Sequence, residues 1–280
     1  MSQECNFLRN YAALVVSKFC VCRVRSLGLF LATLLAASAM LAQSENMSQP
    51  GSPDAAQIVG QLVQKNQERT ALLHHFEGCR HYALDYTGFP SSKSAEMVVS
   101  VRFDAPAQKQ FQVVREHGSQ VLINRVLKEL LENEKQAVDE QNRKKTALTP
   151  ENYEFRFVGA EVINGRPQYV LEVAPRTKNK FLYRGKIWVD ATDFAVSRIS
   201  AEPAKNPSFW ISHTSIEHEY SKFGDFWLPV RNTSVTKVRL GGTAKLRIDY
   251  SNYLFGIPTK TADADVCDNT SSDLRLSERR

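Results

Sequence analysis

The side chains that could do chemistry in this 280-residue chain form no catalytic or metal-binding motif. No H-E-x-x-H or C-x-x-C pattern is present, and His213 and His218, five apart in one predicted strand, would point to opposite faces. The six histidines are His74, His75, His81, His117, His213 and His218. The sequence therefore predicts no metal site and no bound cofactor.

The serines and carboxylates also lack a catalytic arrangement. A G-x-S-x-G nucleophile motif is absent, and Gly241-Gly242 joins two predicted strands instead of opening a helix around a phosphate. Asp190 and Asp193 could act as a general acid and base, but formation of a turn explains both more simply. The sequence thus predicts a non-enzymatic protein without catalytic residues.

Most of the chain reads as β-strands in which large apolar residues alternate with polar ones. The longest such run extends from Lys180 to Tyr253, interrupted by predicted turns at Asp190–Asp193 and Gly224-Asp225. A hairpin with a turn at Asn164-Gly165 precedes it. Three earlier strands lie between residues 79 and 115, the third from Gln110 to Arg115. The total is about ten strands.

Two helices accompany these strands. The first is predicted from Pro53 to about His75, with apolar residues at helical spacing on one side. The second is predicted from Ser119 to Asp139 and carries a wide apolar stripe. The stripe comprises Leu122, Ile123, Val126, Leu127, Leu130 and Leu131. It suits either plain packing on a sheet or a lid over a hydrophobic cavity.

The number of elements predicts the fold. Ten antiparallel strands do not lie flat in one open sheet, and two one-sided helices cannot cover both of its faces. We therefore expect an α+β, mostly β protein. Its predicted form is a strongly curved antiparallel half-barrel of about ten strands with both helices covering the concave face.

The N-terminal segment, residues 1–42, resembles a cleaved secretory signal. Arg23 and Arg25 precede an apolar run, Leu27 to Ala37, and Ala37-Ser38-Ala39 fits an A-x-A cleavage site, with cleavage expected after Ala39 or Ala42. A membrane anchor is the alternative, although the run is shorter than the roughly 20 residues that a spanning helix needs. The signal predicts export from the cytoplasm.

The remaining chain divides into three parts. We expect a linker at 43–52, one domain at 53–258 and a disordered polar tail at 259–280. Residues 1–42 contain four basic residues and one acidic residue, so the rest retains +3 of the formal net charge of +6, too mild for nucleic-acid binding. Cys79 and Cys267 remain, and the sequence leaves open whether they form a disulfide or stay separate thiols.

Four segments resemble bacterial outer membrane lipoprotein-sorting proteins, within the LolA, LolB and RseB-like superfamily of periplasmic lipoprotein carriers and sensors. The segments are TALTPENYEF (146–155), NGRPQYVLEVAPRTKNKFLYRGKIWVD (164–190), AEPAKNPSFW (201–210) and GDFWLPVRNTSVTKVR (224–239). The resemblance covers about residues 53–255. The likeness to LolA itself rests on element order, and no local motif locates that family's lid-holding arginine.

The resemblance implies a monomeric periplasmic carrier that holds the acyl chains of lipoproteins or lipids in a hydrophobic cavity for sorting to the outer membrane. Transfer partners in the inner and outer membranes would follow from that role. The alternative is an RseB-like envelope-stress sensor that binds a membrane protein. The residues expected to line the cavity are Phe181, Tyr183, Ile187, Phe209, Leu228, Leu122 and Val126.

Overall fold

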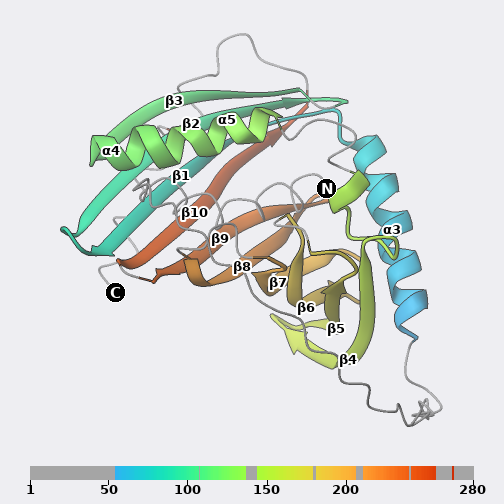
Figure 1. Cartoon of the computed structure of the whole chain (residues 1–280). Helices are drawn as coiled ribbons and strands as arrows, with labels where there is room; N and C mark the ends of the chain where they lie inside the picture. Colours follow the sequence, from blue (N-terminus) through green and yellow to red (C-terminus); the bar gives the residue numbers. More distant parts are fainter. Residues whose placement is uncertain are drawn as a thin grey trace, which may run out of the picture.

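Ten strands form a single antiparallel sheet in the computed structural model, which describes residues 54–106, 108–136, 144–178, 181–205, 211–239, 241–256 and 267 (Figure 1). The strands are β1 (His75–Gly88), β2 (Lys93–Asp104), β3 (Gln108–Gly118), β4 (Tyr153–Ile163), β5 (Arg166–Pro175), β6 (Tyr183–Asp190), β7 (Val196–Pro203), β8 (Ile211–Phe223), β9 (Phe226–Val238) and β10 (Gly242–Phe255). Their order across the sheet is β3-β2-β1-β10-β9-β8-β7-β6-β5-β4. The predicted class, mostly β with an antiparallel sheet of about ten strands, is confirmed. The strong curvature of a half-barrel is not.

The first helix, α3 (Ala55–Leu72), begins two residues after the predicted start at Pro53. Asp54 caps it by accepting a 3.2 Å hydrogen bond from the backbone N–H of Ala56. Ile58, Val59 and Leu62 are at most 2% exposed and hold the helix on the sheet. The helix ends at Leu72, three residues before the predicted end at His75, because His75 already belongs to β1.

The second helix is not continuous. It consists of α4 (Gln120–Leu122), a π-helical turn (Ile123–Leu127) and α5 (Lys128–Gln136). We call these three pieces together the lid helix. Its predicted end at Asp139 lies outside the described residues. The wider π turn buries Ile123, Val126 and Leu127 together, each at most 3% exposed.

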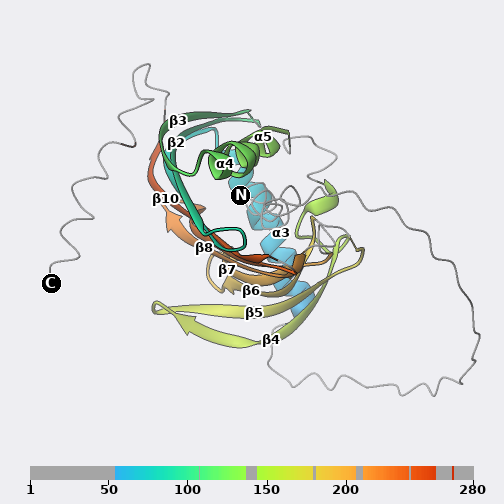
Figure 2. The same ribbon diagram turned by 60° about the vertical axis from the view of Figure 1, so that its left-hand side comes forward.

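Both helices pack on the same face of the sheet (Figure 2). Residues paired across neighbouring strands point to one side, so the strand register defines this side, which we call the inner face. Its central row is Met97, Tyr82, Ile248, Asn232, His218, Ile199, Ile187 and Leu171. The outer face bears cross-strand ion pairs such as Arg231–Asp249.

The inner face carries two separate apolar clusters. Cluster 1 lies between the lid helix and strands β1, β2 and β10, and includes Tyr82, Met97 and Ile248. Cluster 2 lies between α3 and strands β4 to β7, with one residue each from β8 and β9, and includes Leu171, Ile187 and Ile199. Each helix therefore covers its own half of the sheet.

The outer face holds a covalent tether. Cys79 on β1 forms a disulfide with Cys267, and both are buried beside Val98. The neighbouring residues 257–266 and 268–280, and with them nearly all of the predicted tail, lie outside the described residues. So do the predicted signal and linker, residues 1–52. In the part of the chain that the structure describes, no helix combines the length and hydropathy needed to cross a bilayer.

Candidate functional site

The layer beneath the lid helix is a large apolar interface between a helix and the inner face. The six residues of the predicted stripe are all at most 4% exposed. They pack on inward side chains of β1, β2 and β10, among them Leu84, Val99 and Leu246. The stripe was predicted from its spacing alone, and its packing on a sheet is confirmed.

A buried group of charges interrupts this apolar layer. Arg80 on β1 donates from Nη1 to Glu134 Oε2 at 2.7 Å and from Nη2 to Glu134 Oε1 at 3.2 Å. Lys109 Nζ on β3 lies 3.2 Å from Glu134 Oε1. The Arg80 guanidinium also stacks over Phe111 and Tyr250, with its carbon 5.4 Å and 5.1 Å from the ring centroids. The lid helix is thus attached by charge as well as by apolar contact.

A strip of polar side chains continues from this group across the middle of the inner face. Asn232 on β9 donates a 2.7 Å hydrogen bond from Nδ2 to the Tyr250 hydroxyl, and it pairs in register with His218 on β8. Thr214 and Thr236 face each other farther along, with their hydroxyls 3.2 Å apart. Asn232, His218 and the two threonines are at most 5% exposed and belong to neither apolar cluster. The strip therefore separates cluster 1 from cluster 2.

The structure places the described members of the seven predicted cavity residues in different parts of the molecule. Leu122 and Val126 lie in cluster 1, and Tyr183 and Ile187 lie in cluster 2, each at most 3% exposed. Leu228 is fully buried outside both clusters, and Phe181 is half-buried. Phe209 lies outside the described residues. The described members of the set therefore do not line one common space, and their role as ligand contacts stays a prediction.

A second polar centre lies at the turn between β6 and β7, where Asp190 is fully buried. It accepts hydrogen bonds from the backbone N–H groups of Thr192 and Asp193 at 3.0 and 2.8 Å, as the predicted turn requires. It also accepts two hydrogen bonds from Arg166, at 2.6 and 3.0 Å, and one from Gln168 at 3.2 Å. The structure supports the turn interpretation, because this carboxylate is saturated by partners that hold the chain.

Asp193 extends the same network to the β8–β9 hairpin and to α3. Its carboxylate accepts from Lys222 Nζ at 2.8 Å, from Trp227 Nε1 at 3.0 Å and from Arg166 Nη2 at 3.1 Å. Its backbone carbonyl accepts a 2.7 Å hydrogen bond from Arg69 of α3. One short turn therefore joins three parts of the molecule.

The environment of the two aspartates keeps them ionised. Burial acts to raise the pKa of Asp190, but the hydrogen bonds from Arg166 and from the backbone outweigh it, so that pKa is lowered. Burial likewise acts to raise the pKa of Asp193, and the hydrogen bonds from Lys222 and Trp227 lower it overall. The hydrogen bond to Asp190 raises the pKa of Arg166. At neutral pH the network is a set of opposite charges.

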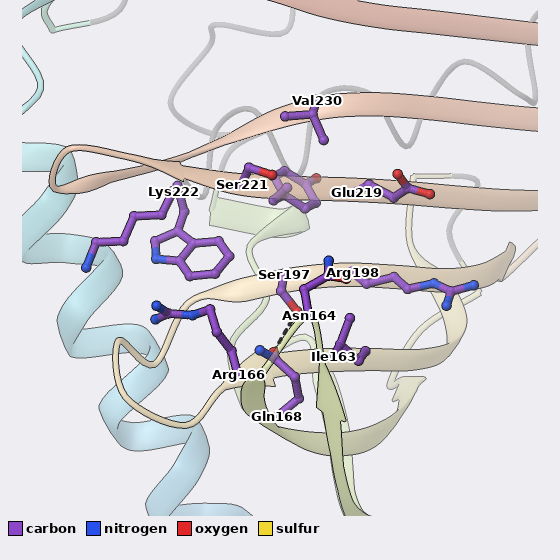
Figure 3. Close-up of a pocket in the computed structure, with 12 residues that line it drawn as sticks. Ile163, Asn164, Arg166, Gln168, Ser197, Arg198, Glu219, Ser221, Lys222 and Val230 are labelled. Carbon is purple, nitrogen blue, oxygen red and sulfur yellow. Dashed lines mark hydrogen bonds between the residues drawn. The ribbon is translucent and has the colours of Figure 1, made fainter. Parts of the chain in front are cut away.

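A pocket of about 410 Å³ opens beside this network (Figure 3). It lies where β7 and β8 separate, because their ladder contains only the pairs from Arg198↔Glu219 to Ala201↔Ile216, whereas β8 stays paired with β9 as far as Phe223. Its lining is Ile163, Asn164, Arg166, Gln168, Ser197, Arg198, Glu219, Tyr220, Ser221, Lys222, Trp227 and Val230. By the strand register, its lining residues Gln168, Arg198 and Glu219 lie on the outer face.

Sequence reasoning missed the charged group beneath the lid helix, although a signal was present. Arg80 stands in step with the inward residues Tyr82 and Leu84, and Glu134 falls on the apolar stripe, four residues after Leu130. A charge at a position where the period demands an apolar residue indicates a buried partner. Within the described residues, no group of three or more His, Cys, Asp or Glu side chains is placed to hold a metal ion.

Comparisons with known proteins give a likeness of fold only. No family model and no curated protein matches the chain. Similar solved structures include a DUF1329 family protein from Desulfovibrio piger, with 12% identity, a TM-score of 0.38 and coverage of 74% of this chain and 95% of that one. An outer membrane lipoprotein-sorting protein domain from Vibrio parahaemolyticus has 13% identity, a TM-score of 0.37 and coverage of 74% and 96%.

A LolA superfamily protein from Nitrosomonas europaea is also similar, with 11% identity, a TM-score of 0.31 and coverage of 74% of this chain and 96% of that one. At such identities and TM-scores, no residue of this chain takes a role from them. The fold and the site define a one-sheet antiparallel protein with a helix-covered apolar face.

Proposed function

We propose that the protein is a non-enzymatic binding protein for the acyl chains of lipoproteins or lipids. The observation that carries this proposal is the lid helix, which covers the inner face with six aliphatic side chains and one buried group of charges. In the proposal, acyl chains bind between the lid helix and strands β1, β2 and β10 after the helix moves outward. The half-barrel form expected from the sequence belongs to this loaded state.

The free energies of burial permit an acyl chain to replace the lid helix on the sheet. Burial of one large aliphatic side chain contributes about 1.5–3 kcal/mol, so six contribute on the order of 10 kcal/mol as an upper bound. An acyl chain of about sixteen carbons gains about 0.8 kcal/mol per methylene, which is a similar total. Ligand burial can therefore offset the apolar contacts that the helix gives up.

The charged group makes displacement of the helix easier than an all-apolar interface would. A buried ion pair stabilises an interface less than apolar side chains of the same volume, because both ions lose their hydration. Arg80 and Glu134 stand within such an interface, and outward movement of the helix returns both to water. The lid helix is thus held firmly in place but can be released.

We further propose that the protein works in the periplasm as a monomer that exchanges its cargo with partners at the inner and outer membranes. Nucleic acid has no place in this role. Support for export comes from the signal-like N-terminal sequence, and the buried disulfide between Cys79 and Cys267 is compatible with an oxidising compartment.

The proposal is tested by analysing protein purified from its own host by native mass spectrometry and lipid extraction. We expect acyl-bearing molecules to co-purify, and a fluorescent fatty acid to be displaced by added lipid. Protein that is consistently empty and does not bind the fluorescent fatty acid would exclude the function.

Three substitutions that each introduce a threonine locate the ligand. Val126→Thr places a hydroxyl in cluster 1 and should weaken fatty-acid binding about tenfold. Val121→Thr, on the 40% exposed side of the same helix, should leave binding unchanged. Ile187→Thr in cluster 2 should also leave it unchanged. If Ile187→Thr alone weakened fatty-acid binding, the ligand site would lie in the α3 half of the sheet instead.

A further inference from the structure

The pocket between β7 and β8 has features of a built ligand site. Its volume of about 410 Å³ falls within the range of small-molecule sites. A register shift between Glu219 and Tyr220 marks an irregularity in β8 at the point where β7 departs. Such irregularities often lie beside functional sites because they redirect side chains. The pocket exists because the ladder stops, so it belongs to the architecture of the sheet.

The floor of the pocket is formed by residues that also pack on the inner face of the sheet. Tyr220 and Trp227 line it, and both also belong to apolar cluster 2 on the inner face. Ile163 and Val230 add apolar surface. Figure 3 shows the polar side chains coming from the strands on both sides of this opening. A ligand there would meet an apolar floor and polar walls.

The charges around the pocket nearly cancel, so they give no strong preference for an ion. Three cations line it, Arg166, Arg198 and Lys222. Four carboxylates lie beside these cations. Asp190 and Asp193 bind Arg166, and Asp193 also binds Lys222. Glu217 lies 3.1 Å from Arg198, and Glu219 lines the pocket itself. The formal sum is −1. A neutral ligand suits this environment better than an anion or a cation.

The polar groups of the pocket offer both donors and acceptors, and one of them is held in a fixed position. Gln168 accepts a 2.7 Å hydrogen bond from the Ser197 hydroxyl and donates to Asp190, so both of its ends are oriented. Asn164 and Ser221 make no side-chain hydrogen bond to another residue in the described part of the chain. Groups with this mixture of donors and acceptors recognise hydroxyls, each of which donates and accepts.

We propose that this pocket binds a neutral saccharide. The hydroxyls of a sugar ring match the mixed donors and acceptors of Asn164, Gln168, Ser221 and the paired charges, and its C–H face matches the partly exposed apolar surface of Ile163 and Val230. The site is distinct from the layer beneath the lid helix, since no residue that lines it belongs to cluster 1. It does not depend on the function proposed above.

The test is a titration of purified protein with maltotriose, cellotriose and chitotriose, followed by NMR of the Trp227 indole N–H and the Asn164 and Gln168 side-chain amides. Inorganic phosphate and acetate serve as anionic comparators. We expect at least one saccharide to shift these resonances in a saturable way. An absence of shifts with all three saccharides, or shifts with phosphate or acetate alone, overturns the proposal.

Two matched variants confirm the location. Ser221→Phe fills the pocket and should weaken saccharide binding about tenfold or more. Ser215→Phe adds the same ring on the outer face of β8, away from the pocket, and should leave affinity within about twofold. Equal affinity of the two variants would place the saccharide elsewhere. The resonance mapping on the unmodified protein tests the site independently if Ser221→Phe does not fold.

Discussion

Arg80 on β1 and Glu134 on α5 form an ion pair whose side chains are only 4% and 1% exposed, although they are 54 residues apart in the chain. The pair lies within the apolar layer beneath the lid helix, so its charges are removed from water on folding. This ion pair joins the lid helix to the inner face of β1 in addition to the apolar contacts of cluster 1.

Removal of one member of this group should destabilise the protein strongly. Glu134→Leu would leave the positive charges of Arg80 and Lys109 beneath the helix without its carboxylate, at a cost of roughly 3–5 kcal/mol. The triple variant Arg80→Met, Lys109→Met, Glu134→Leu should recover most of that loss. Urea unfolding measures both values.

The control for this prediction is the more exposed pair between Lys128 on α5 and Glu116 on β3, which has 43% and 23% exposed side chains. Glu116→Gln should change the free energy of unfolding by about 1 kcal/mol or less. A cost for Glu134→Leu no larger than that of Glu116→Gln would contradict the prediction.

The β6–β7 turn should make stability depend on pH. The pKa of Asp193 is lowered in the folded state, so its charge stabilises the fold fully above its unfolded pKa of about 3.9, and this contribution is lost as the pH falls through the lower folded value. Asp193→Asn should therefore destabilise at pH 7, and by progressively less as the pH falls below about 3.9. Urea unfolding of both proteins across this range gives the difference, and a constant difference would argue against the assignment.

The disulfide should contribute to stability by restricting the unfolded chain. Cys79 and Cys267 are 188 residues apart, and loss of such a bridge typically costs about 2–5 kcal/mol. Cys267→Ser should lower the midpoint of thermal unfolding, and a reducing agent should lower that of the original protein equally. If a reducing agent also lowered the midpoint of thermal unfolding of Cys267→Ser, the effect would come from a thiol reaction other than loss of this disulfide.

Two glycines should respond oppositely to alanine. A Cβ on Gly242 would overlap the backbone oxygen of Thr87 in the β1–β10 ladder, so Gly242→Ala should cost about 2 kcal/mol or more. Gly60 lies within α3 and has open space where the methyl group of an alanine would stand, so Gly60→Ala should stabilise by about 0.5–1 kcal/mol. Thermal unfolding of the two variants checks both signs.

Local rules were sufficient for many elements. The Asn164-Gly165 turn joins β4 and β5 with positive φ at both residues, 51° and 75°, as a two-residue hairpin requires. The turn at Asp190–Asp193, the turn at Gly224-Asp225 and the stripe from Leu122 to Leu131 lie where the sequence placed them. Each depends on residues only a few positions apart, and so the sequence pattern carries it.

The site depended on relationships that no local pattern contains. Tyr183 and Leu122 were expected in one cavity, but the strand order places them in different clusters under different helices. The opening between β7 and β8 arises because their ladder ends at Arg198 while β8 continues beside β9, not because of any motif.

The polar and charged residues show most clearly the difference between local patterns and long-range contacts. Residue patterns alone show that Asp190 and Asp193 form a turn and that the lid helix has one apolar side, because alternation, helical spacing and turn chemistry act over a few residues. The folded arrangement was needed to show that Arg80 contacts Glu134, that Asp193 contacts Lys222, and that one face of the sheet holds two clusters. Strand order and register set those contacts, and both result from the packing of the whole sheet.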